Sequence, residues 1–115
     1  MSQLNVTKML AIGRPTKLND ALVTGTGQLR FQCPVHSNAE SDFSGLFQAV
    51  GTLGSLSANL ELSLDGGVTF SVLASAALVA ATPFKLVTPM LSGNVLWQLN
   101  VTAAPTSADF YVSIN

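Results

Sequence analysis

The chain has 115 residues, of which 48% are hydrophobic and only 10% are charged, and its formal net charge is −1. This length suffices for one domain with its own core, and the high apolar content excludes an intrinsically disordered chain. The basic residues are scattered, which excludes the clustered footprint of a nucleic-acid-binding protein. No apolar run reaches the roughly 18 residues of a membrane span, and the first residues lack a signal-peptide pattern. We therefore expect an intracellularly made, soluble protein, with neither nucleic acid nor membrane as a partner.

Within residues 4–12, Leu4, Val6, Leu10 and Ile12 share one parity, which only Lys8 breaks, and Gly13-Arg14-Pro15 ends the segment. This pattern predicts an N-terminal arm or first strand over residues 1–17, followed by a single β-sandwich domain over residues 18–115. An arm of this apolarity is expected to add to a neighbour's sheet or to lie along its surface. The apolar positions predicted for this interface are Leu4, Val6, Leu10 and Ile12.

Residues 20–24 predict a short strand and residues 28–35 a clearer one, whose inward positions are Leu29, Phe31, Cys33 and Val35. Cys33 is the only cysteine, so no intrachain disulfide forms, and its apolar parity predicts a buried thiol rather than a nucleophile. The polar window 36–42 predicts a loop, and the apolar residues 43–52 predict the next strand. His36, Glu40 and Asp42 in that loop are too few for a hard-metal site, so no metal is predicted.

The strongest local signal is a hairpin over residues 55–73, in which leucines alternate with polar residues on both sides of Asp65-Gly66-Gly67. A three-residue loop over these positions would pair Leu64 with Val68, Leu62 with Phe70 and Leu60 with Val72. This register places every apolar side chain on one face, with Gly67 in the left-handed region.

The remaining sequence reads as further short strands. Residues 74–81 predict a connecting loop or an irregular edge, and residues 84–88, bracketed by prolines, predict an edge strand. In residues 95–102 Trp97 shares the apolar parity and is predicted to be in the core. In residues 110–114 Tyr111 lies on the opposite parity, which makes it a candidate exposed contact at an interface. Seven or eight short strands predict an all-β, antiparallel β-sandwich of jelly-roll type.

No pattern in the sequence indicates catalysis or a cofactor. His36 is the only histidine, and nucleophile-elbow, paired-carboxylate and P-loop patterns are all missing. Two Asn-x-Thr patterns begin at Asn5 and Asn100; without a signal peptide, we interpret them as chance matches. We therefore predict that the protein is not an enzyme.

The sequence Ser63-x-Asp65-x-Gly67-x-Thr69-Phe70 resembles the Asp-box of sialidases and related propellers, with Phe70 in place of Trp. In those families the box occurs in several copies and lies away from the catalytic centre, whereas this chain has one copy and is far too short for a propeller. The predicted role is therefore a structural hairpin turn formed by Ser63, Asp65, Gly66, Gly67 and Thr69.

The hairpin LELSLDGGVTF followed by LSGNVLWQLNVTAAPTSADFYVSIN resembles small β-sandwich proteins of tailed-phage virions over residues 55–115. The resemblance implies a capsid cement (decoration) protein that bridges neighbouring major capsid protein subunits on the virion surface. It also implies a homo-oligomer, with a trimer as one form. The alternatives are a phage tail or baseplate accessory and a carbohydrate-binding or receptor-binding module.

Overall fold

The computed structural model describes residues 3–11, 13–32, 42–76, 84–89 and 95–114. No residue of these ranges is helical, so the expected all-β fold is confirmed. Within them lie nine strands: β1 (Lys8–Met9), β2 (Thr16–Lys17), β3 (Gly27–Gln32), β4 (Asp42–Thr52), β5 (Ser57–Ser63), β6 (Ser71–Ala76), β7 (Phe84–Pro89), β8 (Leu96–Ala103) and β9 (Ser107–Ile114).

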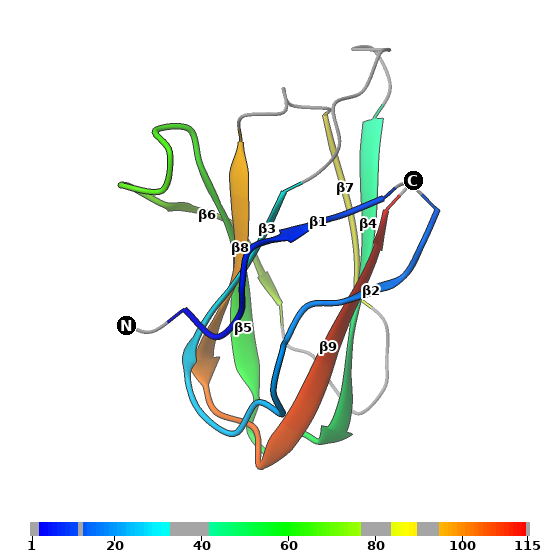
Figure 1. Ribbon diagram of the computed structural model, residues 1–115, viewed down its shortest axis with the longest axis vertical. Coiled ribbons are helices and arrows are strands. Elements are labelled where there is room, and N and C mark those ends of the chain that lie inside the picture. Colours follow the sequence, from blue (N-terminus) through cyan, green and yellow to red (C-terminus); the bar gives the residue numbers. More distant parts are fainter. Residues whose placement is uncertain (1–2, 12, 33–41, 77–83, 90–94, 115) are drawn as a thin grey trace.

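The strands form two sheets, as a sandwich requires (Figure 1). Sheet A has the order β1-β3-β8-β5-β6, and sheet B has the order β2-β9-β4-β7. Neighbouring strands are antiparallel except for β1 and β3, which are parallel. Consecutive strands alternate between the sheets except at the β5–β6 hairpin, a connectivity of the kind found in jelly-rolls. The predicted edge strand over residues 84–88 is confirmed, because β7 ends sheet B.

The core lies between the sheets and is built by the period-2 alternation of their strands. From sheet A, Phe31 and Trp97 stack with ring centroids 6.4 Å apart. Phe31 also meets Phe47 of sheet B at 6.1 Å, so these aromatic rings join the two layers. The predicted inward parities of residues 28–32 and 95–101 are confirmed, including the core position of Trp97.

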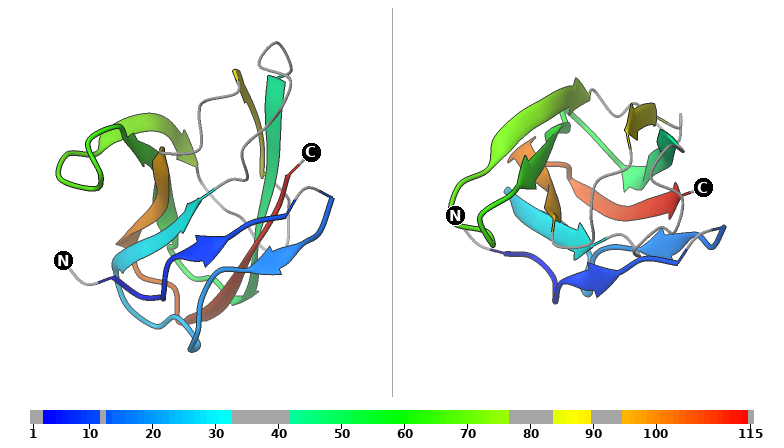
Figure 2. Two further views of the ribbon diagram at one scale, coloured as in Figure 1. Left: turned by 45° about the horizontal axis from the view of Figure 1, so that its top comes forward. Right: turned by 90° about the horizontal axis from the view of Figure 1, so that it is seen from above.

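Residues 3–23 run from the edge of sheet A to the edge of sheet B and lie along one side of the sandwich (Figure 2). β1 pairs with β3, whereas β2 pairs with β9. The expected strand over residues 20–24 is reduced to one bridge between Val23 and Ala108. Leu10 belongs to the protein's own core, so the prediction of an interface role is wrong for this residue.

The predicted register of the β5–β6 hairpin is wrong. Leu62 pairs with Ser71 and Glu61 with Val72, and a bulge follows, so that Leu60 pairs with Ala74. The connection is a wide loop over residues 64–70 rather than a three-residue turn, because the side chains of Ser63 and Asp65 accept hydrogen bonds from backbone N–H groups of the loop. The positive φ predicted for Gly67 is confirmed at 98°.

Candidate functional site

Within the ranges that the structure describes, no group of His, Cys, Asp and Glu residues is arranged to hold a metal ion. Those ranges also contain no helix long and apolar enough to cross a membrane. Two shallow surface hollows lie on sheet B and beside the β5–β6 loop. The surface of the described residues carries exposed apolar groups and networks of hydrogen-bonded polar side chains.

The loop between β5 and β6 is held together by Ser63 and Asp65. The Ser63 hydroxyl donates to Asp65 Oδ1 at 2.6 Å and accepts the N–H of Gly67 at 2.9 Å. The same Oδ1 accepts the N–H groups of Val68 and Thr69 at 3.1 and 2.9 Å. These donors, the Ser63 hydroxyl first, stabilise the carboxylate and lower the pKa of Asp65 to about 2. The predicted turn residues thus lie in one hydrogen-bonded loop.

The β5–β6 loop and the first residues of β6 carry exposed apolar side chains, four of which we call the hairpin patch: Leu64, Val68, Val72 and Leu73. Leu64 is 74% exposed and Val68 is 84% exposed, although the predicted register placed both on the buried face. The patch contains four of the nine large apolar side chains that are exposed in the described ranges. Exposed apolar side chains this close together along the chain are a candidate protein contact.

The loop also folds over the outer face of sheet A. The guanidinium of Arg30 lies 4.9 Å from the ring centroid of Phe70, a cation–π contact. A Cβ at Gly67 would lie 3.1 Å from Leu96 Cδ2, which is closer than ordinary van der Waals contact. The glycine therefore lets the loop backbone approach the sheet closely.

A row of polar side chains, which we call the polar row, crosses the outer face of sheet A: Arg30, Gln98, Glu61 and Asn100. Arg30 Nε donates to Gln98 Oε1 at 3.2 Å, and Gln98 Nε2 donates to Glu61 Oε1 at 2.5 Å. Asn100 Nδ2 donates to Glu61 Oε2 at 3.0 Å, so both oxygens of this buried carboxylate are satisfied. Because Gln98 is only 3% exposed, the row is a structural layer rather than an open platform.

One acceptor of the polar row has no partner among the described residues. Asn100 Oδ1 is buried and accepts no hydrogen bond there. The bond from Asn100 Nδ2 to Glu61 fixes the amide orientation, because a flipped amide would place two oxygens against each other. Because this oxygen is buried, the folded chain does not present it to a ligand.

The outer face of sheet B carries a second apolar group, which we call the sheet B patch: Leu46, Val50 and Tyr111. Tyr111 lies opposite Gln48 of β4 and Lys17 of β2, and it is half-buried. Together with Leu46 it lines a shallow hollow on this face. Tyr111 therefore lies on the outer face, as its parity predicts, and remains a predicted contact residue.

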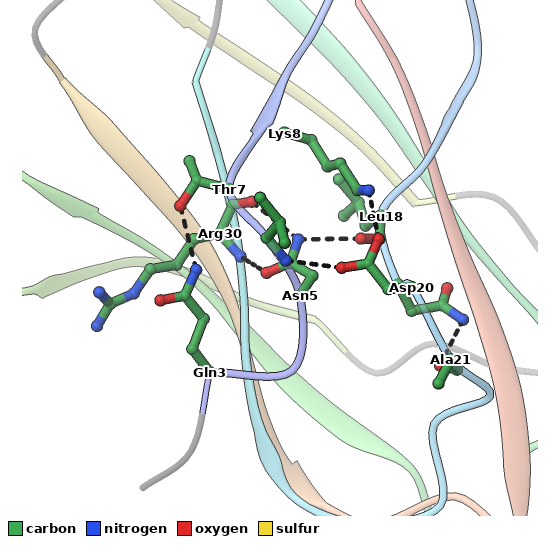
Figure 3. Close-up of polar contacts among 10 residues, drawn as sticks. Gln3, Asn5, Thr7, Lys8, Leu18, Asp20, Ala21 and Arg30 are labelled. Carbon is green, nitrogen blue, oxygen red and sulfur yellow. Dashed lines mark hydrogen bonds and ion pairs between the residues drawn. The ribbon is translucent and has the colours of Figure 1, made fainter.

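The N-terminal segment is attached through Asn5 (Figure 3). Asn5 Nδ2 donates to the carbonyl oxygens of Leu18 and Arg30, at 2.9 and 3.0 Å, and Asn5 Oδ1 accepts the N–H of Arg30 at 2.9 Å. Asp20 forms an ion pair with Lys8 and accepts the N–H of Val6 at 2.7 Å. These contacts lower the pKa of Asp20, with the Lys8 hydrogen bond as the largest cause.

The four predicted interface residues of this segment therefore have different environments. Leu10 is buried, Leu4 packs against the core and Val6 is exposed, while Ile12 lies outside the described residues. Of the described three, only Val6 presents an apolar side chain largely to solvent, and the interface role stays a prediction for Leu4, Val6 and Ile12.

Sequence reasoning missed the asparagines that hold the fold together. Asn19 Nδ2 donates to Asp109 Oδ1 at 2.8 Å, and Asn19 Oδ1 accepts the N–H of Phe110 at 2.9 Å. Both Asn5 and Asn100, which begin the Asn-x-Thr patterns, are buried and hydrogen-bonded, which agrees with chance matches. The sequence around Asn19, which includes Lys17 and Asp20, gives no signal that distinguishes this asparagine from a surface residue.

Several predicted residues lie outside the part of the chain that the structure describes. These are Cys33, Val35, His36 and Glu40, together with the side chain of Asp42. The predictions of a buried thiol and a solvated loop therefore stay predictions.

No family model, no curated protein and no solved structure matches the chain.

Proposed function

We propose that the chain is a structural virion protein, a capsid cement protein that bridges neighbouring major capsid protein subunits. The observation that carries the proposal is the distribution of its exposed apolar side chains. They occur in separate places: the hairpin patch, the sheet B patch and the N-terminal segment. Exposed apolar side chains suit contacts with other proteins, and those of the sheet B patch are flanked by the Lys17–Asp109 ion pair.

Bridging requires at least two contact surfaces on one molecule. The hairpin patch lies at the β6 edge of sheet A, whereas the sheet B patch lies on the other sheet, across the sandwich (Figure 1). One molecule can therefore contact one neighbour through sheet A and another through sheet B. Weak contacts of this kind act together when they are repeated many times over a shell.

The choice of a capsid as the partner comes from the resemblance of residues 55–115 to phage virion proteins. The sandwich and the hydrogen-bonded Ser63-Asp65 loop agree with that resemblance without being specific to it. A carbohydrate-binding role has less support, because Trp97 lies in the core and the polar row is covered.

The proposal is tested by co-sedimentation of the purified chain with expanded empty capsids, followed by cryo-electron microscopy of the decorated particle. We expect ordered density at junctions between capsid subunits. The chain should also be found in purified virions by mass spectrometry. Absence from virions, together with no binding to capsids, would contradict the proposal, and density on the tail would favour the accessory role instead.

Variants of the sheet B patch connect this test to the structure. Val50→Ser and Tyr111→Ser remove apolar contact area from the outer face and should weaken capsid binding. The matched control is Thr102→Ala, which changes an exposed residue of sheet A away from both patches. Equal capsid binding by all three variants would remove the sheet B patch from the proposal.

A further inference from the structure

The three lysines of the chain all occur in strands at sheet edges. Sheet A ends at β1 and β6, and sheet B ends at β2 and β7. Lys8 is in β1, Lys17 is in β2 and Lys85 is in β7, whereas β6 contains no charged residue. Lysine on an edge strand hinders pairing with the edge of another sheet. Among the described strands, β6 is therefore the edge that lacks this protection.

We propose that β6 pairs in antiparallel fashion with β6 of a second copy of this chain, forming a symmetric dimer. In such a two-fold pairing, residues near the axis face their own copies. A charged residue there would face the same charge, so self-pairing favours the uncharged sequence Ser-Val-Leu-Ala-Ser-Ala of β6. A charged partner strand would have no complementary charge to recognise in these six residues.

The charged group nearest to β6 along the chain is compatible with this arrangement. Asp65 lies in the loop before β6, and antiparallel pairing sends the two loops to opposite ends of the paired strands. Six residues of strand span roughly 20 Å, which exceeds the Debye length of about 8 Å at physiological salt. The two carboxylates therefore do not oppose the dimer.

The bulge at Leu73 limits how much of the interface is backbone pairing. Ala74 pairs with Leu60 and Val72 with Glu61, so Leu73 is the extra residue of β6. Bulges bend an edge strand and shorten the ladder that it offers. The hairpin patch, which includes Val72 and Leu73, supplies apolar contact beside this short ladder. A short ladder with limited apolar contact predicts a weak, reversible dimer.

The experiment is sedimentation velocity of the isolated chain over concentrations from micromolar to millimolar. We expect a monomer–dimer equilibrium in the wild type. Val72→Lys should weaken dimerisation by at least about tenfold, because it places two ammonium groups in the interface. The matched control is Leu22→Lys, since Leu22 is 57% exposed and Val72 is 56% exposed but only Val72 lies in β6.

A measurement on the wild type keeps the inference testable even if Val72→Lys does not fold. Backbone amides of residues 71–73 should exchange hydrogen more slowly as the chain concentration rises. A chain that stays monomeric, that forms a trimer, or that dimerises equally well with Val72→Lys would overturn the inference. The inference uses the hairpin patch, as the proposed capsid role does, but the failure of one is distinguishable from the failure of the other because this test uses the isolated chain and no capsid.

Discussion

The two edges of sheet A differ in their hydrogen bonds and in the charge of their residues. At the β1 edge, Asn5 forms hydrogen bonds to three backbone groups, and Lys8 forms an ion pair with Asp20. At the β6 edge, the described residues include no charged group in the strand, and apolar side chains extend into solvent. The β1 edge is bound by the protein's own N-terminal segment, whereas no described strand pairs with the outer edge of β6.

This difference indicates which part of the fold serves stability and which part is available for contacts. Asn5 links β3 to the residues beside sheet B, so its loss affects both sheets. The β5–β6 loop is tied mainly to itself and to Arg30. Changes at the β1 edge should therefore cost more free energy of unfolding than changes in the loop.

The largest effect is expected for Asn5→Ala. The substitution leaves the carbonyl oxygens of Leu18 and Arg30, and the N–H of Arg30, without their partner. We expect the free energy of unfolding to fall by about 2–3 kcal/mol, measured by urea denaturation. The amide of Leu4, which donates to Gln28, should then exchange hydrogen faster.

The control for this prediction is Gln3→Ala, which removes only an exposed hydrogen bond to Thr7. If Gln3→Ala and Asn5→Ala had the same small effect on the free energy of unfolding, the hydrogen bonds of Asn5 would not stabilise the β1 edge as the structure indicates.

Sequence patterns predicted the two faces of the long strands but not the geometry of the hairpin or of the N-terminal segment. Alternation placed Phe31 and Trp97 in the core, because a strand buried on one face requires it. Alternation failed at Leu64 and Val68, since the Ser63-Asp65 network captures the N–H groups that a tighter turn would use.

The N-terminal segment shows a second limit of sequence patterns. Its parity predicted an arm for a neighbouring molecule, whereas Asn5 turns inward and binds the protein's own backbone. The parity of a segment shows which side chains are apolar, but it does not show which backbone groups need a hydrogen-bond partner.

An intermediate effect is expected for Gly67→Val in the β5–β6 loop, beside the β6 edge of sheet A. Gly67 has a φ of 98°, where a β-branched residue is strained, and its new Cβ would press on Leu96. We expect a loss of about 2 kcal/mol in the free energy of unfolding, measured by thermal denaturation. Gly66→Val is the control, because Gly66 also has a positive φ but has open space around it, and it should cost about 1 kcal/mol. A larger loss for Gly66→Val would contradict the position of the loop over sheet A.

A smaller effect is expected for Ser63→Ala. This substitution removes the acceptor for the Gly67 N–H and the donor to Asp65, and we expect a loss of about 1 kcal/mol. The control is Ser71→Ala at an exposed position of β6, which should change stability by less than about 0.5 kcal/mol. Chemical denaturation of both variants checks the difference, and equal values would show that the loop does not depend on this hydroxyl.

The smallest expected effect is on the pH dependence of unfolding. Its response to salt should differ between Asp20, at the β1 edge, and Asp65, in the loop beside the β6 edge. The pKa of Asp65 is about 2 and that of Asp20 is also lowered, each relative to 3.8. A lowered pKa in the folded state gives stability that is present above pH 3.8 and is lost as pH falls toward the folded pKa. Both Asp65→Asn and Asp20→Asn should therefore weaken the pH dependence of unfolding in that window.

Salt distinguishes the two carboxylates because their main partners differ in charge. Asp20 is held by the ammonium of Lys8, an attraction that salt screens, whereas Asp65 is held by the Ser63 hydroxyl and by backbone N–H groups. The contribution of Asp20 should shrink in high salt and that of Asp65 should persist. Denaturation of both variants between pH 5 and pH 2, at low and high salt, measures this. If the two contributions were equally salt-sensitive, the Asp65 carboxylate would be held by a charged partner rather than by the Ser63 hydroxyl and the backbone N–H groups, which would contradict the structure.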